Sequence, residues 1–275
     1  MASIALVHPL FLALNADEQR AESPYFPLGL LYLAAYIRDN GHHVAIYDGT
    51  FEPSPATFTD FLAEGDYDAV GISAVVTNRA TAFEVARVAA AAELTVIVGG
   101  PDPTADPGTY LADPAIDLVV HHEGEQTIVE LLDMIAADEL VTDALSAVSG
   151  IAWRQDGELH VNPPRTPIDD IDTLPVPARD LIDMDRYLDQ WQNDKGYTSI
   201  TVATGRGCPW GCEWCAEAVH GTDWRQRSPE SVAAEVKALK EQFNVDSIRI
   251  IDDVDGLDPA SVSYTHLTLP TTPYV

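Results

Sequence analysis

The amino-acid sequence predicts an α/β fold in two parts. The first is a doubly wound, Rossmann-like parallel sheet, and the second is the start of a β/α barrel. Two observations predict the sheet: short Val- and Ile-rich runs alternate with helical patterns between residues 3 and 137, and several of these runs end in glycine or hydroxyl residues. Such runs are typical of parallel strands covered on both faces. The second part begins at a strand pattern over 198–203 that leads directly into a cysteine-rich loop.

The first two strand patterns flank a long helical pattern. Ser3–His8 is a mostly apolar run, and Val44–Tyr47 is a second one. Between them, Pro27–Asn40 places apolar residues at helical spacing and is followed by Gly41, a residue that commonly ends helices. This segment therefore predicts a strand–helix–strand unit.

The same alternation continues along the chain. We expect, in order, a helix over 58–64, a strand over 69–73, an Ala-rich helix over 80–92, a strand over 95–98, a strand over 118–120 and a helix over 125–137.

Three of the strand ends carry small or polar residues. In open α/β sheets, ligands bind outside the carboxyl ends of the strands. Glycines and hydroxyl residues there allow a large planar ligand to approach the backbone. Ordinary turn chemistry is the alternative for each segment alone. The candidate ligand-binding residues are Ser73, Thr77, Gly99, Gly100, Glu123, Gly124 and Glu125.

A hairpin and a proline-rich segment separate the two parts. Asp156-Gly157 lies between two alternating runs, which is a strong hairpin signal. Five prolines between residues 163 and 177 then indicate an extended linker. We therefore expect a first domain over 1–145, a hairpin and linker over 146–197, and a barrel fragment over 198–261.

The three cysteines of the chain, Cys208, Cys212 and Cys215, lie within eight residues of one another. Three thiolates on one short loop predict a metal site. A structural zinc site needs four ligands, whereas a four-iron cluster held by three thiolates leaves one iron open to an exogenous ligand. Zinc with His220 as fourth ligand and unligated thiols are the alternatives. A disulfide framework is disfavoured, because three is an odd number and no secretory signal is evident.

Barrel-like patterns follow the cysteines. Ser228 is a suitable N-cap and Pro229 a suitable first residue for a helix that extends to about Phe243. Ser247–Ile251 predicts the second barrel strand, and Asp252-Asp253 follows its carboxyl end.

The C-x3-C-x2-C spacing, with Trp214 directly before the third cysteine and a strand at 198–203 before the loop, resembles the signature of radical S-adenosylmethionine (SAM) enzymes. The resemblance implies that residues 198–261 begin a β/α barrel and that a [4Fe-4S] cluster lies beyond its first strand. It also implies that the open iron of the cluster chelates SAM, that SAM is cleaved reductively to a 5′-deoxyadenosyl radical, and that the enzyme uses a small-molecule substrate and a reductase or ferredoxin as electron donor. It assigns Trp214 to cofactor binding. Asp252 and Asp253 would accept hydrogen bonds from the ammonium of the methionine moiety, with loop capping as the alternative.

The strand ends of the first part resemble the cobalamin-binding domain of one large radical SAM subfamily. There a serine motif and a Gly-Gly pair line the slot for the nucleotide tail, and here Gly99 lies 26 residues after Ser73. The Asp-x-His-x-x-Gly motif of other cobalamin proteins is absent, because His8 lacks the flanking Asp and Gly. We therefore expect no histidine ligand to cobalt from that motif.

The subfamily resemblance implies a cobalamin-dependent enzyme that transfers a methyl group to an unactivated carbon, or rearranges or cyclises its substrate. Two alternatives stay open: a radical SAM enzyme with an empty Rossmann-like domain, and a non-catalytic iron–sulfur fragment.

The charge of the chain is extreme. There are 44 acidic and 15 basic residues, for a net charge of −29, and the acidic residues are spread over the whole chain. An evenly acidic surface is typical of salt-adapted proteins and disfavours binding to nucleic acid. We therefore expect a halophilic protein. Clustered thiols favour the reducing cytoplasm, and no apolar run is long enough for a membrane helix.

The last residues, Val262–Val275, do not continue the preceding periodicity and resemble the translation of a sequencing adapter. We expect a non-native tail without regular structure, and a genuine Thr-rich tail is the alternative. The family's barrel has more strand–helix units than this chain supplies, so we expect the chain alone to be inactive.

Overall fold

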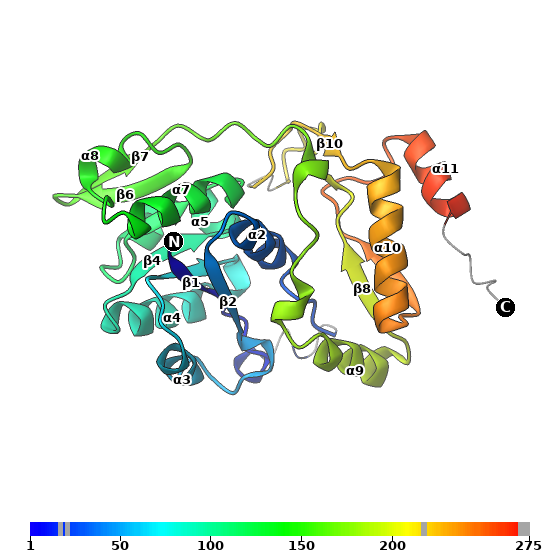
Figure 1. The fold of residues 1–275 in the computed structure, drawn as a ribbon, viewed down its shortest axis with the longest axis horizontal. Helices are drawn as coiled ribbons and strands as arrows, with labels where there is room; N and C mark the ends of the chain where they lie inside the picture. The colour runs from blue at the N-terminus through cyan, green and yellow to red at the C-terminus, as the bar shows by residue number, and fades with distance from the viewer. Residues whose placement is uncertain (16–18, 20–22, 216–218, 269–275) are drawn as a thin grey trace.

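A computed structural model describes residues 1–15, 19, 23–215 and 219–268 and divides them into two α/β units joined by an extended segment (Figure 1). The first unit contains a seven-stranded sheet of order β2-β1-β3-β4-β5-β6-β7. Its strands are β1 (Ser3–His8), β2 (His43–Asp48), β3 (Ala69–Ser73), β4 (Thr95–Gly99), β5 (Leu118–Val120), β6 (Ile151–Gln155) and β7 (Glu158–Val161).

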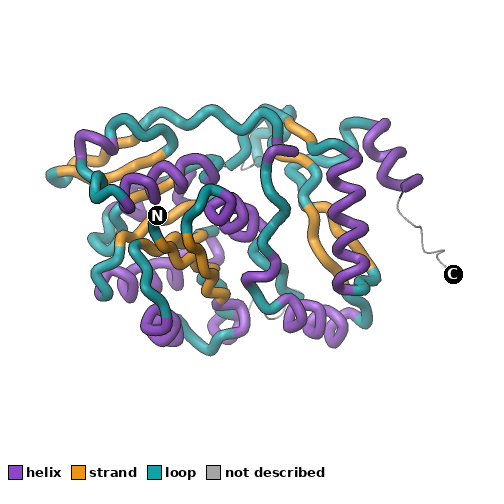
Figure 2. The backbone as a smooth tube through the Cα atoms, in the orientation of Figure 1, coloured by secondary structure: helices purple, strands orange, loops and turns teal. Residues whose placement is uncertain are grey.

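Strands β1 to β5 are parallel, and helices cover both faces of the sheet (Figure 2). Ile4 and Leu6 of β1 pack with helices α2 (Leu28–Asp39) and α7 (Glu125–Ala136). The alternate residues of β1 pack into a second core with α3 (Thr57–Glu64) and α4 (Arg79–Ala91). The doubly wound sheet is thus confirmed. Strand order reverses beside β1, which makes its carboxyl end a topological switch point.

The hairpin extends this sheet beyond the expected boundary at residue 145. Strand β6 pairs antiparallel with β5, and Trp153 lies opposite Leu118. The turn residues Asp156 and Gly157 both have positive φ, 50° and 86°, as a tight two-residue hairpin requires. Without β6, strand β5 would be an open sheet edge, so pairing there satisfies its backbone groups.

The second unit begins as a parallel β–α–β arrangement. Strands β8 (Ser199–Val202) and β11 (Ser247–Ile250) pair in parallel and are joined by α10 (Pro229–Phe243). The Ser228 hydroxyl caps α10 by accepting from the Ser231 N–H at 3.2 Å. Two-residue strands β9 (Gly205–Arg206) and β10 (Arg225–Gln226) pair antiparallel around the cysteine loop. This arrangement is the expected start of a barrel.

The linker contains helix α9 (Met184–Lys195), which the sequence analysis does not anticipate. Its buried side chains contact both units. Tyr187 donates a hydrogen bond to Asp48 Oδ2 at 2.6 Å, at the end of β2. Trp191 donates to the Pro24 carbonyl at 2.9 Å. These two hydrogen bonds attach the linker to the first unit. The same helix also packs against β8 of the second unit.

The expectation of an irregular tail after Ser261 is wrong for its first residues. Helix α11 covers Pro259–Thr268 and lies beside α10 (Figure 1). Pro259 suits a first helical position, and the Asp258 carboxylate accepts from the Ala260 N–H at 2.9 Å, so local capping starts this helix. Residues 269–275 of the expected tail lie outside the described residues.

The remaining elements are short. They are the 3₁₀ turns η1 (Leu12–Leu14), η2 (Gly49–Phe51), η3 (Val76–Asn78), η4 (Ile171–Thr173) and η5 (Arg179–Leu181), and the helices α5 (Pro101–Ala105), α6 (Pro107–Leu111) and α8 (Thr142–Leu145). Of the helices in the described ranges, none combines the length and the apolarity needed to cross a bilayer.

Burial makes the surface more acidic than the composition suggests. Among the residues that the structure describes, four arginines and three glutamates are buried, although the chain has 44 acidic residues against only 15 basic ones. We expect the thermal unfolding midpoint to rise as potassium chloride approaches 1 M, where the Debye length is about 3 Å and screens self-repulsion. Calorimetry in potassium chloride and in choline chloride of equal ionic strength tests this. A midpoint that stays flat or falls with salt contradicts the salt-adaptation interpretation.

Candidate functional site

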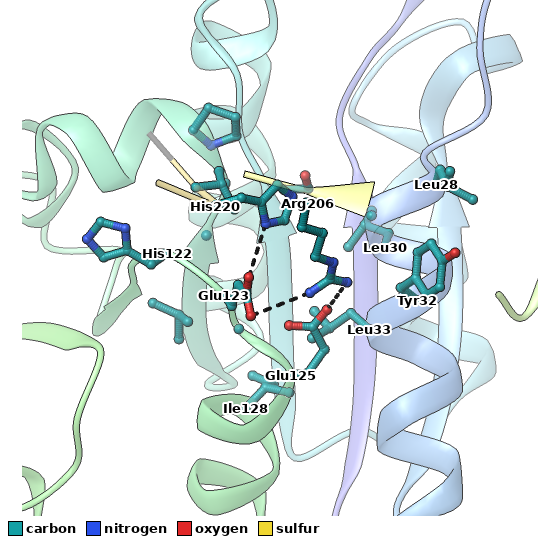
Figure 3. Close-up of a pocket in the computed structure, with 18 of the residues that line it drawn as sticks. Leu28, Leu30, Tyr32, Leu33, His122, Glu123, Glu125, Ile128, Arg206 and His220 are labelled. Carbon is teal, nitrogen blue, oxygen red and sulfur yellow. Dashed lines mark hydrogen bonds and ion pairs between the residues drawn. The ribbon is translucent and has the colours of Figure 1, made fainter. Parts of the chain in front are cut away.

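A cavity of about 320 Å³ lies where the strand ends of the first unit meet the second unit (Figure 3). Most of its wall is apolar and comes from α2 and from strands β1, β3, β4 and β5. The second unit contributes residues that follow β8 and β11, among them Ala203 and Ile251. Seven of the residues singled out from the sequence line it: Ser73, Gly99, Gly100, Glu123, Gly124, Glu125 and Asp253.

Three other predicted residues do not line the cavity. Thr77 is exposed in η3. Trp214 is 87% exposed on the cysteine loop. Asp252 instead binds Thr204, accepting from its N–H at 2.7 Å and from its hydroxyl, and burial raises the pKa of Asp252 despite these hydrogen bonds. For Asp252 the structure thus favours the loop-capping alternative.

The Gly-Gly pair brings neighbouring backbones close together. Gly100 has φ of +112°, and a Cβ placed on it would lie 2.5 Å from the Ala74 carbonyl oxygen. Its conformation is therefore required by the fold itself. Gly29 of α2 also lines the cavity, and a Cβ there would meet no atom within 4 Å. Gly29 therefore borders the cavity at a position where the fold leaves room for a side chain.

One wall of the cavity is polar and is centred on Glu123, in the loop between β5 and α7. Its Oε1 accepts from Arg225 Nη2 at 2.5 Å and lies 3.4 Å from His220 Nδ1. Its Oε2 accepts from the Ile168 N–H at 3.1 Å and lies 3.7 Å from Arg206 Nη1. Residues from both units and the linker therefore converge on this buried carboxylate.

These contacts predict a pH dependence of stability. Burial alone would raise the pKa of Glu123, but hydrogen bonds from His220 and Arg225, the charge of Arg206 and the Ile168 N–H outweigh it and lower the pKa from 4.5 to about 2. A pKa lowered by folding stabilises the native state above pH 4.5, and this contribution of about 3 kcal/mol is lost as pH falls towards 2.

The Glu123→Gln substitution replaces the carboxyl group with an amide that does not titrate. It therefore removes the pH-dependent contribution of Glu123 to the free energy of unfolding. The difference in unfolding free energy between wild type and Glu123→Gln should be constant above about pH 6 and narrow by about 1 kcal/mol at pH 4. Denaturant unfolding at each pH measures it. A difference that does not change between pH 7 and pH 4 contradicts the assignment.

Arg206 lies beside this carboxylate and is almost completely buried. Its Nη2 donates to Glu125 Oε1 at 2.6 Å, and its guanidinium lies 5.6 Å from the centre of the Tyr32 ring. Burial opposes its charge, but Glu125 and Glu123 outweigh burial and raise the pKa of Arg206. Among the described residues, Nη1 has no hydrogen-bond acceptor.

A second buried ion cluster connects the units behind the cavity. Arg179 lies 2.8 Å from Glu235 of α10, and Arg227 also binds this carboxylate. Arg227 Nη1 donates to the Ala203 carbonyl at 3.0 Å and to the Tyr32 hydroxyl at 3.3 Å. Because Tyr32 belongs to α2, this cluster holds the first unit against β8.

The cysteine loop begins directly above the cavity. Gly207 has φ of +80°, and a Cβ on it would lie 2.3 Å from the Asp223 carbonyl oxygen, so a glycine is required there. The Gly207 N–H donates to Asp253 Oδ2 at 2.8 Å, and the Cys208 N–H donates to the Gly221 carbonyl at 3.1 Å. The loop is thus anchored at its first cysteine.

The structure keeps the three cysteines on one loop but does not arrange them as ligands. Cys208 is buried, whereas Cys212 and Cys215 are exposed. In the described part of the chain, no three Cys, His, Asp or Glu side chains converge in a metal-binding geometry. Three soft thiol donors on eight residues nevertheless fit an iron–sulfur cluster chemically. The cluster ligands stay a prediction.

Comparison with known proteins agrees with this geometry. The B12 binding domain family matches residues 19–132. Over 239 residues the chain is 34% identical to the uncharacterized methyltransferase PH0819 of Pyrococcus horikoshii, covering 84% of this chain and 50% of that protein. Residues 19–132 are thus similar to a B12 binding domain, and the chain as a whole is similar to a methyltransferase.

Two further proteins are similar to this chain. The anaerobic magnesium-protoporphyrin IX monomethyl ester cyclase of Synechocystis sp. is 29% identical over 260 residues, covering 91% of this chain and 49% of the cyclase. The cobalamin-dependent radical SAM enzyme OxsB, solved with aqua-cobalamin and SAM bound, shares the fold with a TM-score of 0.76 at 22% identity, covering 92% of this chain and 34% of OxsB. The chain spans about half the length of the curated relatives it matches.

Sequence reasoning missed the arginines of the polar wall. Arg206 and Arg225 flank the cysteine loop, but their partner Glu123 lies 83 and 102 residues earlier in the chain. His220, considered only as a zinc ligand, faces Glu123 instead. No local sequence signal marked these arginines, because their burial and their pairing in β9 and β10 appear only in the folded structure.

Proposed function

We propose that this chain is the cofactor-binding portion of a cobalamin-dependent radical SAM enzyme that methylates an unactivated carbon, or rearranges or cyclises its substrate. One observation carries the proposal. The carboxyl ends of β3, β4 and β5 face the same cavity as Ala203, Arg206 and Asp253 of the second unit. Ligands bind at such strand ends in both fold types, so two cofactors held there would be neighbours.

In this proposal each part of the cavity wall has a task. Cys208, Cys212 and Cys215 would hold the cluster, and Asp253 would help to orient SAM. Gly99 and Gly124 would leave room for a corrinoid at the strand ends. When bound, the cluster would supply the electron that cleaves SAM, and the corrinoid would supply the methyl group.

The rest of the wall would exclude water. Apolar side chains of α2 and of the strand ends shield the cavity, and a water-excluded site limits side reactions of reactive species. A small-molecule substrate and a reductase or ferredoxin that delivers electrons complete the proposed reaction.

The main alternative is a radical SAM enzyme whose first unit binds no corrinoid. Anaerobic reconstitution with iron, sulfide and hydroxocobalamin, followed by gel filtration and measurement of iron and corrinoid per chain, separates the two. We expect both to stay bound, and we expect SAM to perturb the electron paramagnetic resonance spectrum of the reduced cluster. A cluster without corrinoid supports the alternative, and the absence of any cluster contradicts both.

A further inference from the structure

We propose that Arg206 and Glu123 form a subsite for a carboxamide of the bound ligand. Arg206 Nη1 would donate a hydrogen bond to the amide oxygen, and Glu123 Oε2 would accept one from the amide nitrogen. The inference rests on the proposed function, in which the cavity receives a corrinoid, because a corrinoid carries carboxamide side chains around its ring.

The first observation is a buried donor without an acceptor. The Arg206 side chain is 9% exposed and lines the cavity, yet among the described residues nothing accepts a hydrogen bond from Nη1. Leaving a buried polar group unpaired is costly, and native structures rarely do so. Such a donor at a cavity wall points to an acceptor on a ligand.

The second observation is the acceptor beside it. Arg206 Nη1 and Glu123 Oε2 form an ion pair, drawn as a dashed line in Figure 3. The two atoms are 3.7 Å apart, which is too far for a hydrogen bond between them. Oε2 accepts from the Ile168 N–H at 3.1 Å, and a carboxylate oxygen can accept a second hydrogen bond. The wall therefore presents a donor and an acceptor side by side, and a primary carboxamide carries the complementary pair.

The third observation is the charge balance of the wall. The carboxylates of Glu123 and Glu125 face the guanidinium groups of Arg206 and Arg225 within 3.7 Å. Two negative and two positive charges cancel, so a buried ligand group with a net charge would stay uncompensated. A ligand carboxylate would also lie close to the Glu123 carboxylate. The wall therefore favours a neutral group.

The competing role for Arg206 is structural. It would only tie β9 to α7 through Glu125 and to α2 through the Tyr32 ring. This role predicts no discrimination between ligands that differ in a single amide.

The test uses corrinoids that differ in one group. The anaerobically purified chain is titrated with hydroxocobalamin and with its monocarboxylic acid derivatives, each having one side-chain carboxamide hydrolysed, and affinity is read from the visible spectrum. We expect one derivative to bind about 10- to 100-fold more weakly, because it loses the hydrogen bond to a charged group and brings a carboxylate to Glu123. The other derivatives should bind within a few-fold of hydroxocobalamin.

The Glu123→Gln variant identifies the contact. Its uncharged amide can donate to a ligand carboxylate, so the penalty against that one derivative should shrink while hydroxocobalamin itself binds more weakly. Glu84→Gln, on the exposed face of α4, removes a carboxylate elsewhere and should leave the wild-type pattern intact.

Equal binding of all derivatives to wild type overturns the subsite, and this outcome needs no variant to fold. An unchanged penalty in a folded Glu123→Gln protein also overturns it. Failure of wild type to bind hydroxocobalamin contradicts the proposed function instead, so the two failures are distinguishable.

Discussion

Replacing Cys208, Cys212 or Cys215 with Ala is expected to abolish the iron–sulfur cluster. Iron after anaerobic reconstitution should fall from about four atoms per chain to near zero. Three thiolates are the full set available, since the chain contains no further cysteine. Each ligand is therefore indispensable, and the visible absorbance of the cluster should disappear together with the iron.

The apoprotein should tolerate these changes, which separates loss of ligand from loss of fold. Cys212 and Cys215 are exposed, so truncating them removes little buried surface. Cys208 is buried, and its truncation should cost about 1 kcal/mol. Glu213→Gln, on the same loop, is the matched control and should retain iron. A triple Cys→Ala chain that still assembles a four-iron cluster would refute the assignment.

Gly29→Trp is expected to weaken corrinoid binding by about 10- to 100-fold. Gly29 borders the cavity, and a Cβ added there would meet no atom within 4 Å, so the position has room for an indole that narrows the cavity. A 10- to 100-fold loss corresponds to about 1.4–2.8 kcal/mol of binding free energy, which is lost because the ligand must compete with the indole. Gly100 is a poor position for this test, because any side chain there collides with the Ala74 backbone.

Two controls accompany this variant. Gly29→Ala should bind corrinoid normally and raise the unfolding free energy by about 1 kcal/mol, because alanine is the better helix former within α2. Ala91→Trp places the same indole at an exposed position on α4, away from the cavity. Equilibrium dialysis with hydroxocobalamin measures all three. Undiminished uptake by folded Gly29→Trp would show that the ligand does not occupy this cavity.

Most elements of the first unit were predictable because their signals are local. The apolar run Ser3–His8 and the periodic segment that became α2 match the structure within one or two residues at each end. Helix α9 carried a usable signal as well. Met184, Tyr187, Leu188 and Trp191 repeat at helical spacing and are all buried, but the surrounding prolines directed the interpretation to a linker.

The site was predictable only in part, for a physical reason. A parallel sheet places all carboxyl strand ends on one edge, so Ser73, Gly99 and Glu123 could be grouped from the strand pattern alone. The charges that complete the wall come from residues distant in sequence, and no local pattern pairs Arg206 with Glu125. Such pairs form only when the second unit docks on the first.

The central claim is that a corrinoid binds between the two units, at the strand ends of the first. Anomalous diffraction at the cobalt absorption edge, on crystals of the chain loaded with hydroxocobalamin, tests it most directly. The account predicts one strong cobalt peak in or at the mouth of the cavity between Gly99 of β4 and Arg206 of β9. A cobalt peak on the outer faces of the sheet, away from this cavity, would contradict it.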